Sequence, residues 1–155
     1  MLPEIERSAA EAFRGSSQDA IADDAVAPVE FYAPLQREGL VLIADDGGEL
    51  IGFVACEAFE DALHVWELAV RHDRQGRGAG RALMAEAAVL ARRRGLSAVT
   101  LSTFRDIAWN GPFYARLGFV ELAPADLNLR LAAVLEREAA LGLDVARRCA
   151  MRLSL

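Results

Sequence analysis

Apolar and polar positions in the first quarter of the chain predict helices. Residues 3–14 carry apolar side chains at helical spacing, which predicts an amphipathic helix that ends at Gly15-Ser16-Ser17. Residues 18–38 are helical in pattern only in parts, because Pro28 and Pro34 remove backbone donors and interrupt the pattern. We therefore expect one clear helix followed by a broken helical segment.

Three short apolar runs follow, separated by turn residues. Residues 40–44, 49–59 and 62–70 have the length and composition of strands, and Asp45-Asp46-Gly47-Gly48 joins the first two with residues that tolerate positive φ. The turn at Glu60-Asp61 precedes the third run. We expect these runs to form an antiparallel meander.

The second half of the chain alternates between helical and strand-like patterns. The elements that we expect are a helix over 78–94 closed by Gly95, a strand over 97–104, a short helix capped by Asn110, a strand from 119, a helix capped by Asp126 that ends at Gly142, and a strand over 146–153. A strand that follows another through a helix runs parallel to it, so the strand at 97–104 should pair in parallel with the one at 62–70. The pattern predicts an α/β fold with a mixed sheet.

Composition and charge narrow the class of protein. The 155 residues suit a single domain over 1–155, and a net charge of -6 argues against a nucleic-acid partner and favours cationic partners such as amines. No apolar run is long enough to span a membrane, and no signal peptide is visible. Cys56 and Cys149 stand in apolar runs without metal-type neighbours, so we expect buried thiols, no metal and a cytoplasmic location.

One stretch combines a strand, a glycine-rich loop and a helix start. The strand ends in Leu68-Ala69-Val70, and the loop then reads Gln75-Gly76-Arg77-Gly78-Ala79-Gly80-Arg81. Glycines let a backbone approach a ligand closely, and the free amides at a helix start bind anions, so this stretch suits a pyrophosphate. Arg77 and Arg81 would add charged donors. A P-loop needs Lys and Ser or Thr after the last glycine, and a dinucleotide fingerprint needs G-x-G-x-x-G, so both are excluded.

A second motif lies downstream, where Asn110 and Tyr114 precede Gly118-Phe119. Together with the loop pattern Q/R-x-x-G-x-G/A, filled by Gln75, Gly78 and Gly80, it resembles the GNAT N-acetyltransferase family. The resemblance extends over about residues 40–153 and is specific for the family but not for the substrate.

The resemblance implies a fold and a reaction. The family's sheet is mixed and mostly antiparallel, has helices on both faces, and splays two parallel strands at its centre. The thioester arm of acetyl-CoA would pair with backbone near Leu68 and Val70, and its pyrophosphate would bind at residues 75–80. An amine would attack the thioester directly, and Tyr114 matches the family's general acid.

The general base has several candidates. His64 and Glu67 both lie on the third strand, at positions where family members carry a His or an acid, and imidazole titrates in the useful range. Strand alternation places His64 and Trp66 on one face and Glu67 on the other, unless a bulge re-aims them. A water molecule is the third candidate.

Further alternatives stay open. Asn110 is either a contact to the pantetheine arm or only a helix cap, because its spacing to Tyr114 is shorter than is usual in the family. The family normally begins with a strand, and this chain starts almost on the first helix. We therefore expect the strand at residues 40–44 to leave an unpaired edge or to find another partner, and expect either a homodimer that covers this edge or a chain that begins downstream of the natural start. The acceptor is a small amine, a protein N-terminus or a lysine, and a CoA-binding regulatory module without catalysis is the rival from another class.

Overall fold

The structure, a computed structural model, describes all 155 residues. The helices are α1 (Leu2–Ala10), α2 (Val29–Arg37), α3 (Ala79–Arg93), α4 (Gly111–Arg116) and α5 (Leu129–Ala140). The strands are β1 (Val41–Asp46), β2 (Glu49–Ala58), β3 (Ala62–Val70), β4 (Ala98–Phe104), β5 (Val120–Glu121) and β6 (Arg148–Ser154).

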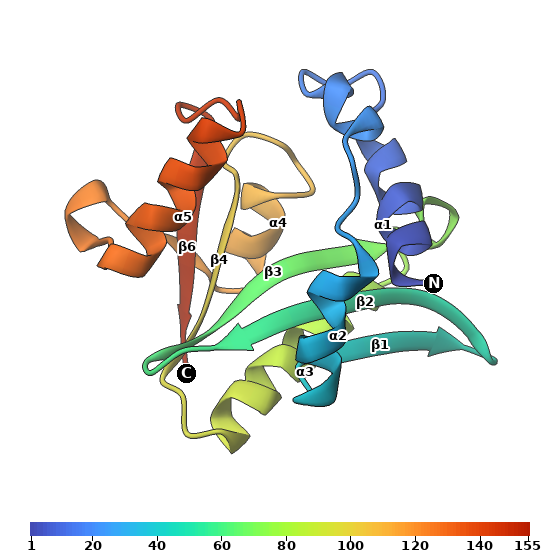
Figure 1. The fold of residues 1–155 in the computed structure, drawn as a ribbon, viewed down its shortest axis with the longest axis horizontal. Helices are drawn as coiled ribbons and strands as arrows, with labels where there is room; N and C mark the ends of the chain where they lie inside the picture. Colours follow the sequence, from blue (N-terminus) through green and yellow to red (C-terminus); the bar gives the residue numbers. More distant parts are fainter. The chain divides into compact units, whose positions relative to one another are not determined.

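The six strands form one mixed sheet with the order β1-β2-β3-β4-β6-β5 (Figure 1). β3 and β4 pair in parallel over Ala62–Val65 and Ala98–Leu101, whereas β1–β2, β4–β6 and β5–β6 are antiparallel. The predicted α/β class, the mixed sheet and the parallel pair are confirmed. The first element is a helix, and β1 is an edge strand.

The chain groups into two compact units, each built from two segments. The first contains residues 1–58 and 66–90, and the second contains residues 59–65 and 91–155. β3 and α3 each run without a break from one unit into the other.

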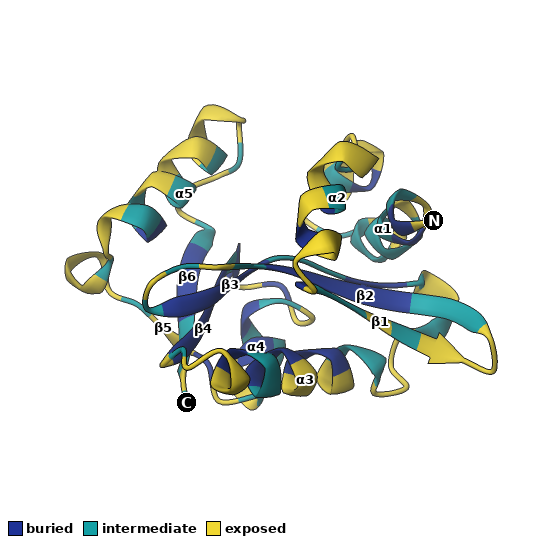
Figure 2. Ribbon diagram, turned by 60° about the horizontal axis from the view of Figure 1, so that its bottom comes forward, coloured by how far each residue is buried: buried dark blue, intermediate teal, exposed yellow.

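In the first unit, helices cover both faces of the β1–β2 hairpin. α1 and α2 lie on one face and the N-terminal part of α3 on the other (Figure 2). Tyr32 of α2 is 1% exposed, and its ring meets Phe53 of β2 edge-on with the centroids 5.3 Å apart. The hairpin turn is Gly47-Gly48, with φ of +66° and +93°, a conformation that glycine adopts without strain.

In the second unit, α5 and α4 lie on opposite faces of the β4–β6 ladder (Figure 2). Thr100 and Ser102 of β4 contact side chains of α5, and the register pairs Thr100 with Arg152. On the other face, Gly118 after α4 lies next to Leu153. The alternation along β4 thus gives a polar layer under α5 and an apolar layer over α4.

Three local predictions were wrong. Pro34 lies inside α2 and does not interrupt it, because Tyr32 and Leu35 anchor the helix by burial on both sides of the proline. The cap of α5 is Asn128, whose side chain accepts from the Leu131 amide at 2.9 Å, while Asp126 ends the preceding 3-10 turn. Asn110 stands at the N-cap position of α4, but its side chain makes no capping hydrogen bond.

No helix in the structure combines the length and the apolar character needed to cross a membrane.

Candidate functional site

The glycine loop connects β3 to α3 in the first unit. A 3-10 turn over His72–Arg74 follows β3, and α3 begins at Ala79. Gly76 and Gly78 have φ of +74° and +94°, which side chains with a Cβ rarely adopt. A Cβ at either position would meet no protein atom within 4 Å, so backbone conformation and not crowding explains these glycines.

The predicted loop side chains point in different directions. Gln75 donates through Nε2 to the Val70 carbonyl at 2.9 Å and to the Ala9 carbonyl at 3.5 Å, so its side chain ties the loop to β3 and α1. Arg77 donates to the Asp73 carbonyl at 3.2 Å, and Arg81 is exposed on the first turn of α3. The backbone amides and the two arginines are therefore the loop's accessible donors, and Gln75 has a structural role.

Two further arginines, one just before the 3-10 turn and one at its last residue, were not assigned a role from the sequence. Arg71 and Arg74 both bind Glu49 at the start of β2, with N–O distances of 2.7 Å and 2.6 Å. Asp73 lies 3.3 Å from Arg71 and 3.5 Å from Arg74. No sequence signal links Glu49 to residues more than twenty positions away, since they come together only because β2 and β3 are neighbours in the sheet.

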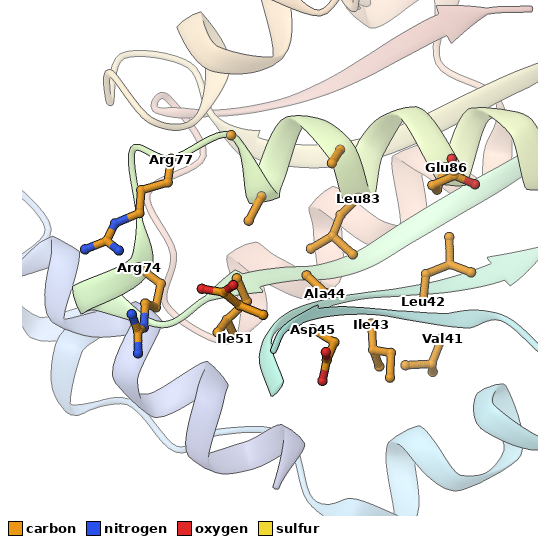
Figure 3. Close-up of a pocket in the computed structure, with 14 residues that line it drawn as sticks. Val41, Leu42, Ile43, Ala44, Asp45, Ile51, Arg74, Arg77, Leu83 and Glu86 are labelled. Carbon is orange, nitrogen blue, oxygen red and sulfur yellow. The ribbon is translucent and has the colours of Figure 1, made fainter. Parts of the chain in front are cut away.

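A groove of about 920 Å³ runs along β1 beside the first half of α3 (Figure 3). Its walls include Leu42 and Leu83, and Arg74 and Arg77 lie together at one end. β1 is the edge of the sheet, and Ile43 at its centre is 59% exposed. The groove therefore contains the exposed edge strand of the sheet.

The C-terminal half of β3 carries the other predicted residues of the first unit. Ala69 and Val70 are buried, and Trp66, Glu67 and Leu68 are all half-buried, so burial does not alternate along this strand. Trp66 donates through its indole nitrogen to Glu57 of β2 at 2.8 Å. Its ring meets Phe31 of α2 edge-on at 6.4 Å, and Phe31 is 40% exposed. Trp66, the residue before Glu67, thus joins an aromatic ring of α2 to a carboxylate of β2.

A buried network in the same unit joins α1 to α2. The Tyr32 hydroxyl donates to Glu6 at 2.6 Å, and the Ala27 amide donates to both Glu6 oxygens at 3.1 and 3.2 Å. Burial raises the pKa of Tyr32 above its usual range, and the hydrogen bond to Glu6 and the negative charge of Glu67 act in the same direction. The phenol therefore stays protonated, and Glu67 lies close enough for its charge to act on this network.

His64 lies in the second unit and is fully buried. Its Nδ1 is 3.0 Å from the Thr100 hydroxyl, and the Phe59 ring meets the imidazole edge-on at 6.4 Å. Arg130 of α5 stacks over Phe59 at 4.3 Å and donates to Thr100 at 3.3 Å. Burial lowers the pKa of His64 to about 3, and the charge of Arg130 adds to the effect. His64 is therefore a neutral core histidine at pH 7.

Tyr114 and Asn110 also belong to the second unit. Tyr114 is the fourth residue of α4 and is 9% exposed, with its ring edge-on to Phe113 at 5.1 Å and to Phe119 at 5.7 Å. Its amide donates to the Asn110 carbonyl at 3.0 Å, which closes the first turn of the helix. A buried aromatic cluster thus holds the phenol in one orientation, and the two predicted residues are one helical turn apart.

The match to known proteins agrees with this geometry. Residues 37–121 match the family model described as an acetyltransferase (GNAT) domain, which covers both the glycine loop and the helix of Tyr114. The chain belongs to the GNAT acetyltransferases. The family, the fold and the reaction class predicted from the two motifs, acetyl transfer from acetyl-CoA, are thus confirmed.

Solved structures of GNAT proteins share the fold. PaiA N-acetyltransferase from Thermoplasma acidophilum, in complex with coenzyme A, is 17% identical with a TM-score of 0.71, over 99% of this chain and 91% of that one. The ribosomal-protein-alanine N-acetyltransferase from Brucella melitensis is 19% identical with a TM-score of 0.67, over 99% and 94%. Rv2747 from Mycobacterium tuberculosis, in complex with CoA and NLQ, is 20% identical with a TM-score of 0.64, over 84% and 83%.

Proposed function

We propose that this GNAT chain transfers the acetyl group of acetyl-CoA to a primary amine by direct attack within a ternary complex. The observation that carries the proposal is the glycine loop, where two residues of positive φ lead into the N-terminus of α3. Free amides at a helix start and exposed Arg77 and Arg81 suit the pyrophosphate of CoA.

The thioester arm would follow the end of β3. Leu68, Ala69 and Val70 are the residues whose backbone we assign to the pantetheine chain. Of these, Val70 already accepts a hydrogen bond from Gln75 through its carbonyl, so Leu68 is the better partner for the arm. Asn110 is a candidate for the same arm, since its side chain is not used as a helix cap.

The chemistry needs an acid and a base. The amine nitrogen attacks the thioester carbon, the C–S bond breaks, the ammonium proton passes to the base, and the acid protonates the leaving thiolate. We assign the acid to Tyr114, because its position matches the family's motif and its ring is held by Phe113 and Phe119. We favour Glu67 over His64 as the base, because Glu67 is half-buried whereas His64 is buried with a pKa of about 3.

The acceptor class follows from the surroundings of Glu67. Trp66, which precedes Glu67 on β3, donates to the Glu57 carboxylate and meets the Phe31 ring edge-on. Carboxylates and aromatic faces both attract an organic cation. We therefore favour a small cationic amine over a protein N-terminus or a lysine side chain.

Release of free thiol tests the proposal. Purified protein is mixed with acetyl-CoA and one acceptor from a panel of small amines, peptides with free N-termini and lysine peptides. We expect release of thiol with the small amines. Binding of acetyl-CoA without turnover on any acceptor would show a non-catalytic CoA-binding module instead. Gly78→Val forces a side chain into the left-handed region at the phosphate site and should abolish acetyl-CoA binding in calorimetry. Unchanged binding would rule out the loop assignment.

The domain organisation, the oligomeric state and the location of the protein are also proposed. The units share β3 and α3, so we take residues 1–155 as one catalytic domain. A homodimer that covers the β1 edge would give Ile43 a partner, and light scattering that shows a monomer would exclude it. Two free buried cysteines, Cys56 and Cys149, suit the reducing cytoplasm.

A further inference from the structure

We propose that Glu49 is a positioning residue for the phosphate-binding loop and acts through Arg71 and Arg74. Glu49 is the first residue of β2, directly after the Gly47-Gly48 turn. One carboxylate oxygen binds Arg71 Nη1 at 2.7 Å and the other binds Arg74 Nη2 at 2.6 Å. A single carboxylate therefore holds two guanidinium groups from one loop.

The two arginines bracket the start of the loop. Arg71 directly follows β3, and Arg74 is the last residue of the 3-10 turn before Gln75. The Arg71 amide also donates to the Ile51 carbonyl of β2 at 2.9 Å. The loop thus leaves the sheet from a point fixed to β2 by backbone and side-chain bonds.

The loop is also fixed to α1. The His72 amide donates to the Ser8 hydroxyl at 3.1 Å, and Gln75 reaches the Ala9 carbonyl. These bonds and those of Glu49 hold the turn on two sides. A loop whose donors are already in place binds an anion without the cost of ordering it, so fixing the turn should strengthen phosphate binding.

Glu49 also divides the arginines of this region by their partners. Arg71 and Arg74 are engaged by Glu49 and Asp73, so their charges are matched within the protein. Arg77 and Arg81 are exposed and have no carboxylate partner at ion-pair distance. Two arginines, Arg71 and Arg74, thus have a structural role, whereas Arg77 and Arg81 can bind phosphate.

This inference rests on the proposed role of the glycine loop, and Glu49→Gln tests it. Partly exposed ion pairs contribute little to stability, so the variant should fold normally. The KM for acetyl-CoA should rise about three- to ten-fold, as expected for the loss of two such pairs, while kcat at saturation stays unchanged. With S-acetylpantetheine, which lacks the phosphates, kcat/KM should equal that of the wild type.

Two variants serve as controls. Asp46→Asn removes the same charge from the residue that pairs with Glu49 across the hairpin, and it should leave the KM for acetyl-CoA unchanged. Arg74→Gln removes one of the two pairs and should raise this KM by less than Glu49→Gln does, and the double variant should be no worse than Glu49→Gln alone.

The outcomes separate the two proposals. An unchanged acetyl-CoA KM in Glu49→Gln, with binding abolished in Gly78→Val, would overturn the positioning role and leave the loop assignment standing. An equal fall in kcat/KM with S-acetylpantetheine would also overturn it. So would additive increases in the KM for acetyl-CoA in the double variant. Unchanged binding in Gly78→Val would remove the loop assignment and the positioning role together.

Discussion

The imidazole of His64 and the hydroxyl of Thr100 share a hydrogen bond of 3.0 Å between β3 and β4, and both side chains are fully buried. The register places the two residues directly opposite each other in the parallel ladder. Arg130 donates to the same hydroxyl, so a positive charge lies beside the imidazole. This environment disfavours the imidazolium ion and makes His64 a pH-dependent element of stability.

We expect the free energy of unfolding to fall between pH 6.5 and pH 5 because of His64. The pKa of His64 is lowered from 6.5 to about 3, so the unfolded chain takes up a proton in this range and the folded chain does not. Stability from this group is complete above pH 6.5 and declines as the pH falls, by about 2 kcal/mol at pH 5. Urea unfolding at several pH values measures this decline.

Two variants make that measurement specific. His64→Gln keeps a hydrogen-bonding side chain next to Thr100 and should flatten the decline, whereas His72→Gln changes an exposed histidine and should not. The same pH dependence in His64→Gln and the wild type would mean that other groups cause it.

The pH dependence of the reaction should identify the base. Glu67→Gln should shift or remove the acidic limb of the kcat/KM profile while acetyl-CoA binding in calorimetry is retained, because only the proton acceptor is lost. His64→Gln should leave the limb in place, since the buried imidazole stays neutral at the pH of the reaction. If neither variant changes the limb, water or the amine's own titration accounts for it.

Tyr114→Phe should lower kcat without weakening cofactor binding. The substitution keeps the ring that packs against Phe113 and Phe119 and removes only the hydroxyl. Loss of a general acid typically costs about 100-fold to 10,000-fold in rate, while the KM for acetyl-CoA should stay nearly constant. A thioester with a more acidic thiol should partly restore the rate. Near wild-type kcat with chemistry rate-limiting would show that Tyr114 is only a core residue.

The native thiols should resist alkylation, in keeping with direct transfer that forms no acetyl-enzyme. Burial raises the pKa of Cys56 to about 12 and that of Cys149 to about 11, so little thiolate forms at pH 8. Mass spectrometry after iodoacetamide treatment should show no modification of the folded protein and two modifications in denaturant. Rapid labelling of the folded protein that acetyl-CoA prevents would instead point to a reactive cysteine.

The elements and the glycine loop could be predicted from the sequence, because their signals are local. A glycine at positive φ ends or starts an element within a few residues, as at Gly47, Gly78 and Gly95. The loop at residues 75–81 is likewise a contiguous motif whose conformation follows from its own glycines. Family and reaction class followed from this loop and the motif around Tyr114, and the family match confirms them.

Competing local signals were harder to rank from the sequence. Asp126 and Asn128 are both good caps two residues apart, and the structure selects Asn128 because its side chain reaches the Leu131 amide. Pro34 carries a strong interruption signal, but the burial of Tyr32 and Leu35 outweighs it. At the cap a local hydrogen bond decides, whereas at Pro34 tertiary packing outweighs the local cost of proline.

Only the tertiary structure decided the environment of the side chains. Glu49 binds two arginines that follow it by 22 and 25 positions, and Tyr32 binds Glu6 across 26 positions. His64 resembled a base because an unperturbed imidazole titrates near neutral pH, but burial and Arg130, which lies 66 residues further along the chain, shift its titration far below that range. Charge and desolvation act through space, so the sequence determined which residues carry chemistry, and the fold determined their protonation states and partners.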